Sequence, residues 1–140
     1  MSKPIKIPDV DNIGSKNGLI LEDETYAIVG AAMEVYYKLG NGFAEPVYQE
    51  ALAIELNLRG VPFAEQKNLR IEYKGHRLKK GFLADFLCFD QIIVEIKAIS
   101  QLSPVDWSQI MNYLKAGKFR VGLLFNFGSV ARLETKRIVI

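Results

Sequence analysis

The spacing of apolar residues changes after the first third of the chain, and this change limits the folds that the chain can adopt. In the first third, apolar side chains recur three or four positions apart, which is typical of amphipathic helices. In the middle third they alternate with polar side chains or form short apolar runs, which indicates strands. The expected elements are helices at about residues 23–39 and 45–59 and an antiparallel meander of strands at about residues 68–73, 78–89 and 91–98.

The last third of the chain adds a helix between two strands. The sequence from Ser103 to Asp106 predicts a helix start, with a capping serine, a proline and a first-turn aspartate, and Gly117 is expected to end this helix. The apolar residues 120–127 and the residues 132–139 follow as strands. Because a strand, a helix and a strand in succession favour a parallel pair, we expect an α/β fold with a mixed central β-sheet flanked by helices.

Composition predicts one domain. The chain has 140 residues, of which 49% are hydrophobic, which is enough for a core over residues 23–140, preceded by a flexible N-terminal arm at residues 1–22. No apolar run has the length of a membrane span, so we expect a cytoplasmic protein. Cys88 is the single cysteine, and its apolar neighbours favour a packed thiol over a nucleophile.

Charge is distributed unevenly along the chain. Residues 1–65 contain five Lys and Arg against ten Asp and Glu, and residues 66–140 contain thirteen against six. The densest basic segment, residues 74–80, is expected at a hairpin tip, where it either contacts phosphates or forms a solvated turn. His76 lies in this segment without a Cys or His neighbour and is a poor metal ligand candidate.

Two carboxylates are expected to meet on neighbouring strands. If residues 89–91 form a tight turn, Asp85 lies almost opposite Glu95, and Lys97 shares a face with Glu95. Two carboxylates at this separation repel unless a cation lies between them, and Mg²⁺ accepts one or two carboxylates together with waters and phosphate oxygens. The alternative is a cross-strand salt bridge in which Lys97 neutralises an acid. The apolar strands around these charges favour a functional site.

Strand alternation also assigns faces to these residues. On the second strand, Leu83, Asp85 and Leu87 are expected to share a face, and on the third strand Ile93 is expected to join Glu95.

Several ordered motifs resemble those of one family. The sequence from Gly42 to Tyr48 resembles the signature of the GxxExxY proteins, a branch of the PD-(D/E)xK nuclease superfamily. The resemblance covers about residues 25–138 and implies a restriction-endonuclease-like core with the order αβββαβ. The further motifs are Gln66, Tyr73-Lys74-Gly75, Ala84-Asp85, Val94-Glu95-Ile96-Lys97, residues 109–114 and residues 122–128.

The resemblance implies roles for individual residues. Asp85 and Glu95, with the backbone carbonyl of Ile96, would hold Mg²⁺ or Mn²⁺, and Lys97 would orient the attacking water and stabilise developing negative charge. Glu45 would add a further acid near the metal, although it is equally explained as a carboxylate at the start of a helix.

Gln109 and Tyr113 resemble the QxxxY motif of the RecB-like nuclease branch and share one helical face. Tyr48 and Tyr113 are better explained as aromatic residues at the edge of the core than as catalysts. Gln66 is expected before the first strand, where it is equally explained by backbone hydrogen bonds. Trp107 departs from the family pattern and is expected to affect substrate access. The expected contacts to nucleic acid are Lys74, Arg77, Lys79, Lys80 and Tyr113.

Two functions follow from these residues. The first is a metal-dependent nuclease that hydrolyses phosphodiester bonds, with nucleic acid, foremost DNA, as partner and a homodimer as the expected means of enclosing a duplex. The second is a non-catalytic adaptor that keeps the nuclease fold and binds nucleic acid or a protein. Titration with Mn²⁺ separates them, because an adaptor has no reason to bind metal at Asp85 and Glu95.

Overall fold

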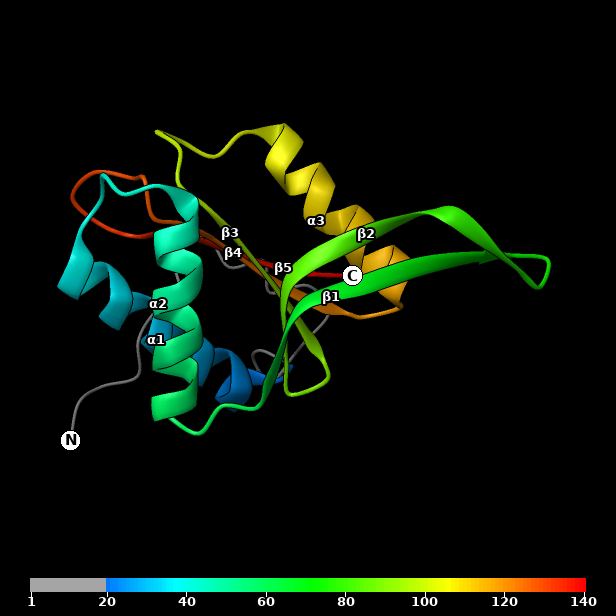
Figure 1. The fold of residues 1–140 in the computed structure, drawn as a ribbon, viewed down its shortest axis with the longest axis horizontal. Coiled ribbons are helices and arrows are strands. Elements are labelled where there is room, and N and C mark those ends of the chain that lie inside the picture. Colours follow the sequence, from blue (N-terminus) through cyan, green and yellow to red (C-terminus); the bar gives the residue numbers. More distant parts are fainter. Residues whose placement is uncertain (1–19) are drawn as a thin grey trace.

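The computed structural model describes residues 20–140 of the chain (Figure 1). The expected arm at residues 1–22 lies outside the described residues apart from its last three positions. There Ile20 and Leu21 pack against the core, and Glu22 starts helix α1.

Residues 20–140 form three helices and five strands, and each of the expected elements is present. Their order contains the helix, three strands, helix and strand of the restriction-endonuclease-like core. The elements are α1 (Glu22–Leu39), α2 (Glu45–Leu58), β1 (Phe63–Tyr73), β2 (His76–Cys88), β3 (Ile92–Lys97), α3 (Pro104–Gly117), β4 (Val121–Asn126) and β5 (Glu134–Val139).

The five strands form one mixed sheet in the order β1-β2-β3-β4-β5. Strands β3 and β4, joined through α3, are parallel, and the other neighbouring strands are antiparallel. Helices α1 and α2 cover one face and α3 covers the other (Figure 1). Because β3 and β4 are covered on both faces, they are apolar almost throughout, as expected of central strands.

The start of β1 and the end of α3 are among the element boundaries that differ from the sequence-based expectation. β1 begins at Phe63 rather than near residue 68. The sequence pattern did not predict this first part of the strand, because residues 64–68 are exposed and show no apolar alternation. Gln66 therefore lies inside β1 and not before it. Helix α3 includes Gly117, and the left-handed residue that follows the helix is Lys118, with φ 61°. A Cβ on Gly117 would lie 2.6 Å from the ring of Phe119, so this glycine permits close packing.

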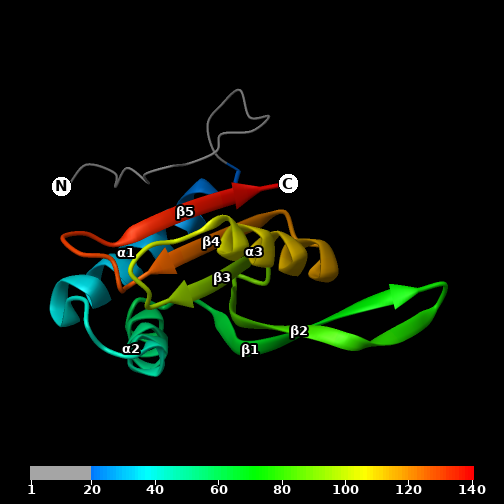
Figure 2. The ribbon, with the colours of Figure 1, turned by 90° about the horizontal axis from the view of Figure 1, so that it is seen from above.

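Strands β1 and β2 continue beyond the sheet as a two-stranded hairpin, which extends away from the rest of the domain (Figure 2). Its register shifts between Arg70 and Glu72, which marks a bulge. Lys74 and Gly75 form the tip with positive φ angles of 49° and 80°, as hairpin turns of two residues require. The basic segment is therefore at a hairpin tip, as the sequence predicts.

Cys88 is fully buried in the core between the sheet and helices α1 and α2. Burial raises the pKa of its thiol to about 12, so the prediction of a packed, unreactive thiol is confirmed. Among the helices of residues 20–140, none has both the length and the apolar character needed to cross a membrane.

Candidate functional site

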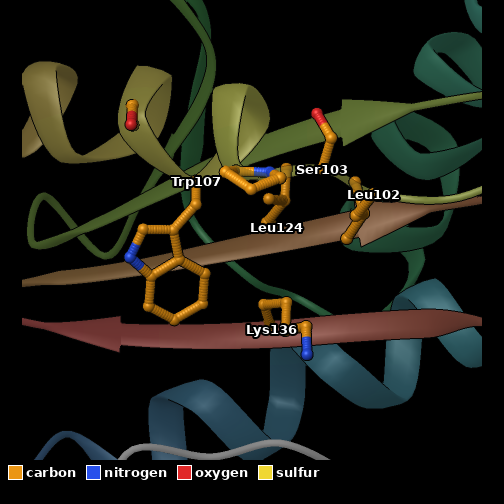
Figure 3. Close-up of a pocket in the computed structure, with 7 residues that line it drawn as sticks. Leu102, Ser103, Trp107, Leu124 and Lys136 are labelled. Atoms are coloured by element: carbon orange, nitrogen blue, oxygen red, sulfur yellow. The ribbon is translucent and has the colours of Figure 1, made fainter.

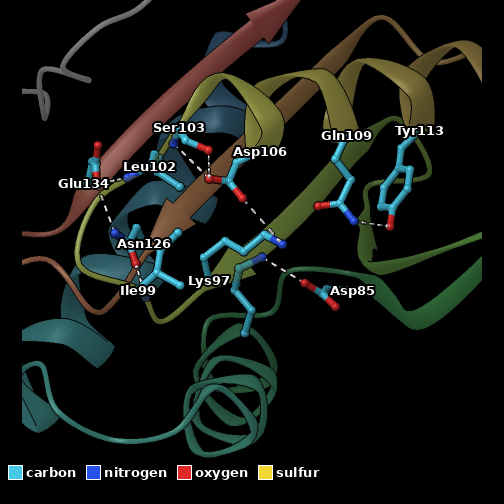
Figure 4. A network of polar contacts seen from close by, with 11 residues as sticks. Asp85, Lys97, Ile99, Leu102, Ser103, Asp106, Gln109, Tyr113, Asn126 and Glu134 are labelled. Carbon is cyan, nitrogen blue, oxygen red and sulfur yellow. Dashed lines mark hydrogen bonds and ion pairs between the residues drawn. The ribbon is translucent and has the colours of Figure 1, made fainter.

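The site lies where β2 separates from β3. Backbone pairing between the two strands joins residues 86–88 to residues 92–94 and then stops. Beyond it, side chains accept the hydrogen bonds. Glu95 Oε2 accepts from the backbone N–H of Asp85 at 2.7 Å. Asp85 Oδ2 accepts from the backbone N–H of Ile96 at 2.9 Å, which is the dashed line at Asp85 in Figure 4. Asp85 and Glu95 thus lie opposite each other, which confirms the prediction from the short turn.

The faces of β2 change at Asp85. Ala84 and Leu87 both pack into the core beneath α3, although they are three positions apart, whereas Phe86 packs on the opposite side. A regular strand would place Ala84 with Phe86. The expectation that Leu83 shares a face with Asp85 and Leu87 is therefore wrong, and Leu83 is 51% exposed.

The change of faces coincides with an irregularity in β1. The register is the same on both sides, with Glu65 opposite Phe86 and Lys67 opposite Ala84, but between them Gln66 adopts a left-handed φ of 52°. Desolvation raises the pKa of the Asp85 carboxyl group, and the neighbouring side chain of Gln66 acts weakly in the opposite direction. Gln66 is thus a neighbour of the predicted site.

Burial keeps the two acids from ionising together. Glu95 is 5% exposed, and desolvation, followed by the charge of Asp85, raises its pKa to about 9. Desolvation also raises the pKa of Asp85, against the hydrogen bond from Ile96. Without a cation the pair therefore retains a proton at neutral pH, and a divalent cation would supply the missing positive charge.

The donor atoms suit a hard cation. The backbone bonds use Oε2 of Glu95 and Oδ2 of Asp85, so the second oxygen of each carboxylate is not engaged by those bonds. Two carboxylates completed by waters are a normal protein environment for Mg²⁺. No group of three His, Cys, Asp or Glu side chains suited to a metal is found within residues 20–140.

Glu45, the first residue of α2, is exposed but lies within electrostatic reach of this pair. Desolvation and then the charge of Asp85 raise its pKa, and Lys97 acts in the opposite direction. A metal-binding role for Glu45 remains a prediction.

Lys97 forms its ion pair with α3 and not across the sheet. Its Nζ lies 3.8 Å from Oδ1 of Asp106, and both side chains are largely buried (Figure 4). Oδ2 of Asp106 accepts hydrogen bonds from the N–H and the hydroxyl group of Ser103, at 2.9 and 3.1 Å. The aspartate expected only to start α3 therefore also positions Lys97.

Gln109 and Tyr113 lie on the side of α3 that faces the sheet (Figure 4). Gln109 Nε2 donates to the hydroxyl group of Tyr113 at 3.1 Å. Tyr113 is 7% exposed, and its ring centroid lies 5.3 Å from that of Phe82. Desolvation and then Glu95 raise the pKa of the phenol, so Tyr113 lies near the acids as part of the core.

Comparison with known proteins identifies the family. A model of the PD-(D/E)XK nuclease superfamily matches residues 22–138. The chain belongs to the PD-(D/E)XK nuclease superfamily. The sheet of this superfamily member, with a parallel β3–β4 pair and helices on both faces, agrees with a restriction-endonuclease-like core.

The chain is similar to the crystal structure of SSO0001, with 17% sequence identity and a TM-score of 0.44 over 83% of this chain. It spans 65% of that protein's length. Among curated proteins, none matches the chain.

Tyr48 explains one motif of this PD-(D/E)XK superfamily member in structural terms. Its hydroxyl group donates to the carbonyl of Gly40 at 2.5 Å and accepts from the N–H of Phe43 at 3.1 Å. Its ring stacks on Phe127 at 4.7 Å. Tyr48 is fully buried inside the core, rather than at its edge as predicted, and fixes the loop that leads into Glu45.

Sequence reasoning missed a polar residue that fixes the chain after Lys97. Asn126, fully buried at the end of β4, accepts hydrogen bonds from the N–H groups of Ile99 and Gly128 at 2.9 and 3.0 Å. Its amide group donates to Glu134 at 3.0 Å, and Glu134 also accepts from the N–H of Leu102 at 3.1 Å. A polar residue at the end of an apolar strand was the available signal.

Gly128 allows this loop to approach the backbone that follows β4. A Cβ on Gly128 would lie 2.3 Å from the carbonyl oxygen of Ile99 and 2.5 Å from its nitrogen. Since both atoms belong to the backbone, a side chain here would displace the segment after Lys97.

Trp107 faces away from the two acids. It lines a pocket of about 390 Å³ between α3 and strands β4 and β5, together with Leu102, Leu124 and Lys136 (Figure 3). Asp85, Glu95 and Lys97 are not among its lining residues. No contact between Trp107 and these three residues therefore supports the predicted effect of Trp107 on substrate access.

Proposed function

We propose that this chain is a metal-dependent nuclease that hydrolyses phosphodiester bonds of nucleic acid. The observation that supports it best is the pairing of Asp85 with Glu95 at the separation of two strands, beside Lys97. A buried and a half-buried acid that cannot both ionise alone are poorly explained as a structural device, because an uncompensated pair of this kind is destabilising.

The proposed site divides the work among its residues. Asp85, Glu95 and the carbonyl of Ile96 would hold Mg²⁺ or Mn²⁺, with Glu45 as a further acid beside them. When bound, the ion would polarise the phosphate and lower the pKa of a coordinated water. Lys97, positioned by Asp106, would orient that water and stabilise the negative charge that develops on the phosphate. Gln109 would complete the site from α3.

Finer assignments belong to the same proposal. We place the chain in the GxxExxY branch, on the motif that ends in Tyr48, and relate Gln109 and Tyr113 to the RecB-like branch. A cytoplasmic location and a homodimer remain predictions, of which sedimentation velocity tests the second.

A cleavage assay tests the proposal. The purified chain is incubated with single- and double-stranded DNA and RNA in Mg²⁺, Mn²⁺ or EDTA. We expect metal-dependent cleavage that falls at least about 100-fold in Glu95→Gln. Asp90→Asn is the matched control, because it removes one charge at the exposed turn between β2 and β3. Undiminished cleavage by Glu95→Gln would refute the mechanism.

Calorimetric titration with Mn²⁺ separates the nuclease from the adaptor. A nuclease site should bind the ion in the wild type and lose it in Asp85→Asn. If no ion binds even with an oligonucleotide present, the adaptor is the correct function.

A further inference from the structure

The β1–β2 hairpin begins at the proposed active site and ends far from it. From Asp85 to the tip at Gly75 the strand spans about 30 Å at roughly 3.3 Å per residue. Every residue from 72 to 80 is exposed, so beyond the bulge the hairpin has no layer packed against it (Figure 2). A ribbon of this length without a covering layer is available to a partner.

The positive charge of the chain is concentrated in this hairpin. Residues 66–82 contain six Lys and Arg against one Glu, a net charge of +5, whereas the whole chain carries +2. The remainder of the chain is therefore at −3. The basic residues are Lys67, Arg70, Lys74, Arg77, Lys79 and Lys80.

One of these residues has a structural role. Nη1 of Arg70 donates to the carbonyl groups of Leu78 and Lys79 at 3.2 and 3.0 Å, which closes the bulge. Gly81 admits this side chain, since a Cβ there would lie 2.9 Å from Cδ of Arg70.

The ion pairs described among residues 20–140 do not involve the other hairpin cations. They join Glu55 to Arg59 and Lys97 to Asp106, and neither pair lies in the hairpin. Lys74 and Lys80 instead lie over the rings of Tyr73 and Phe82. Solvated cations on a projecting ribbon suit a polyanion.

The shape of the hairpin favours duplex DNA among polyanions. Proteins that bind single strands line a groove with several stacking aromatics, whereas the exposed part of this hairpin offers one, Tyr73. The major groove of B-form DNA admits a two-stranded ribbon, and the deep, narrow groove of A-form RNA does not.

We propose that the hairpin, residues 66–82, is a DNA-binding arm that lies along the major groove of a duplex, beside the site at Asp85. This inference rests on the proposed function, because the position of the hairpin beside Asp85 matters only if Asp85 belongs to an active site. An arm of about 30 Å covers about nine base pairs at 3.4 Å each. Lys74, Arg77, Lys79 and Lys80 would contact phosphates of that stretch.

Fluorescence anisotropy with a labelled DNA duplex in EDTA tests the arm without cleavage. The test variant replaces Lys74, Arg77, Lys79 and Lys80 with Gln. We expect its affinity to fall at least tenfold, and the slope of log K against log salt to become shallower by up to about 3.6, at about 0.9 for each lost phosphate contact. A control variant replaces four exposed cations elsewhere, Lys38, Lys115, Lys118 and Arg132, with Gln.

The outcomes are distinct. Equal losses of DNA affinity in the test and control variants would refute the DNA-binding arm and would indicate a non-specific effect of charge. A duplex RNA or a single strand bound as tightly as the DNA duplex, with the same loss in the test variant, would overturn the choice of B-form DNA. DNA binding that depends on the hairpin, without any cleavage, would support the arm and refute the proposed nuclease. Cleavage together with unchanged binding in the test variant would support the nuclease and refute the arm.

Discussion

The side chain of Glu95 accepts a hydrogen bond, at 2.7 Å, from the backbone N–H of Asp85, the residue whose negative charge raises the pKa of Glu95 after desolvation. Asp85 in turn accepts from the next backbone N–H along β3. The two acids therefore replace the sheet hydrogen bonds that end where β2 leaves β3. A substitution that removes the acceptor oxygen at either position affects the sheet as well as the site.

Asp85→Ala and Asp85→Asn should separate these two effects. We expect Asp85→Ala to destabilise the fold by about 1–3 kcal/mol, because the N–H of Ile96 loses its acceptor. Asp85→Asn retains an acceptor oxygen, so it should unfold near the wild-type urea concentration while it loses metal-dependent cleavage. Urea denaturation followed by circular dichroism, beside the cleavage assay, measures both. Equal stability of the two variants would contradict the role of the carboxylate in the sheet.

The raised pKa of Glu95 makes the metal-free protein sensitive to alkaline pH. Its pKa is about 9 in the folded state against an ordinary value of 4.5, so between these values the folded state holds a proton that the unfolded state releases. Stability conferred by this proton is complete below about pH 4.5 and is lost as pH rises toward 9. In EDTA, the free energy of unfolding should fall with pH by at most about 1.4 kcal/mol per unit from this group.

Glu95→Gln tests this pH dependence. Because the amide does not ionise, the decline between about pH 6 and pH 8 should be smaller in the variant. Urea denaturation in EDTA at both pH values measures it. Parallel declines in the wild type and in Glu95→Gln would contradict the assignment.

Asp106→Asn should affect turnover through Lys97. Asn can still accept from the N–H of Ser103, so α3 keeps its start, but the negative charge 3.8 Å from the Lys97 amine is lost. We expect kcat to fall about tenfold, with little change in KM or in Mn²⁺ affinity, because the charge acts on transition-state stabilisation. An unchanged kcat would show that Asp106 only caps the helix.

Gly128→Ala should be among the most damaging small substitutions. Its Cβ would overlap the backbone of Ile99, so the segment after Lys97 must move, at a cost of at least about 2 kcal/mol. Gly30→Ala is the matched comparison, because its Cβ would meet only the flexible end of Arg59, at 3.1 Å, in the middle of α1. The comparison variant should be neutral or up to about 1 kcal/mol more stable in urea denaturation. Similar stabilities for the two variants would contradict the close approach.

The order of elements and the pairing of Asp85 with Glu95 were predictable because they depend on local signals. A short turn between two strands fixes which residues lie opposite, so the turn at residues 89–91 placed these acids together. The switch of faces at Asp85 was not predictable in this way. It coincides with the left-handed conformation of Gln66, for which a glutamine gives no sequence signal.

The contacts that position Lys97 could also not be predicted from the sequence. Asp106 has a complete local explanation as a helix-capping residue, so nothing in the sequence points to its second partner. Asn126 and Glu134 are eight positions apart in sequence and meet only because β4 and β5 pair. Such contacts follow from tertiary structure and not from periodicity.

The burial of Cys88 makes the wild-type chain nearly inert toward thiol-directed probes. It is the only cysteine of the sequence, and its protonated thiol lies beneath α1 and α2. A fluorophore or spin label introduced through His76→Cys, at the exposed hairpin tip, would therefore attach at one place. The position of the hairpin relative to a labelled DNA end then becomes a distance that can be measured in solution.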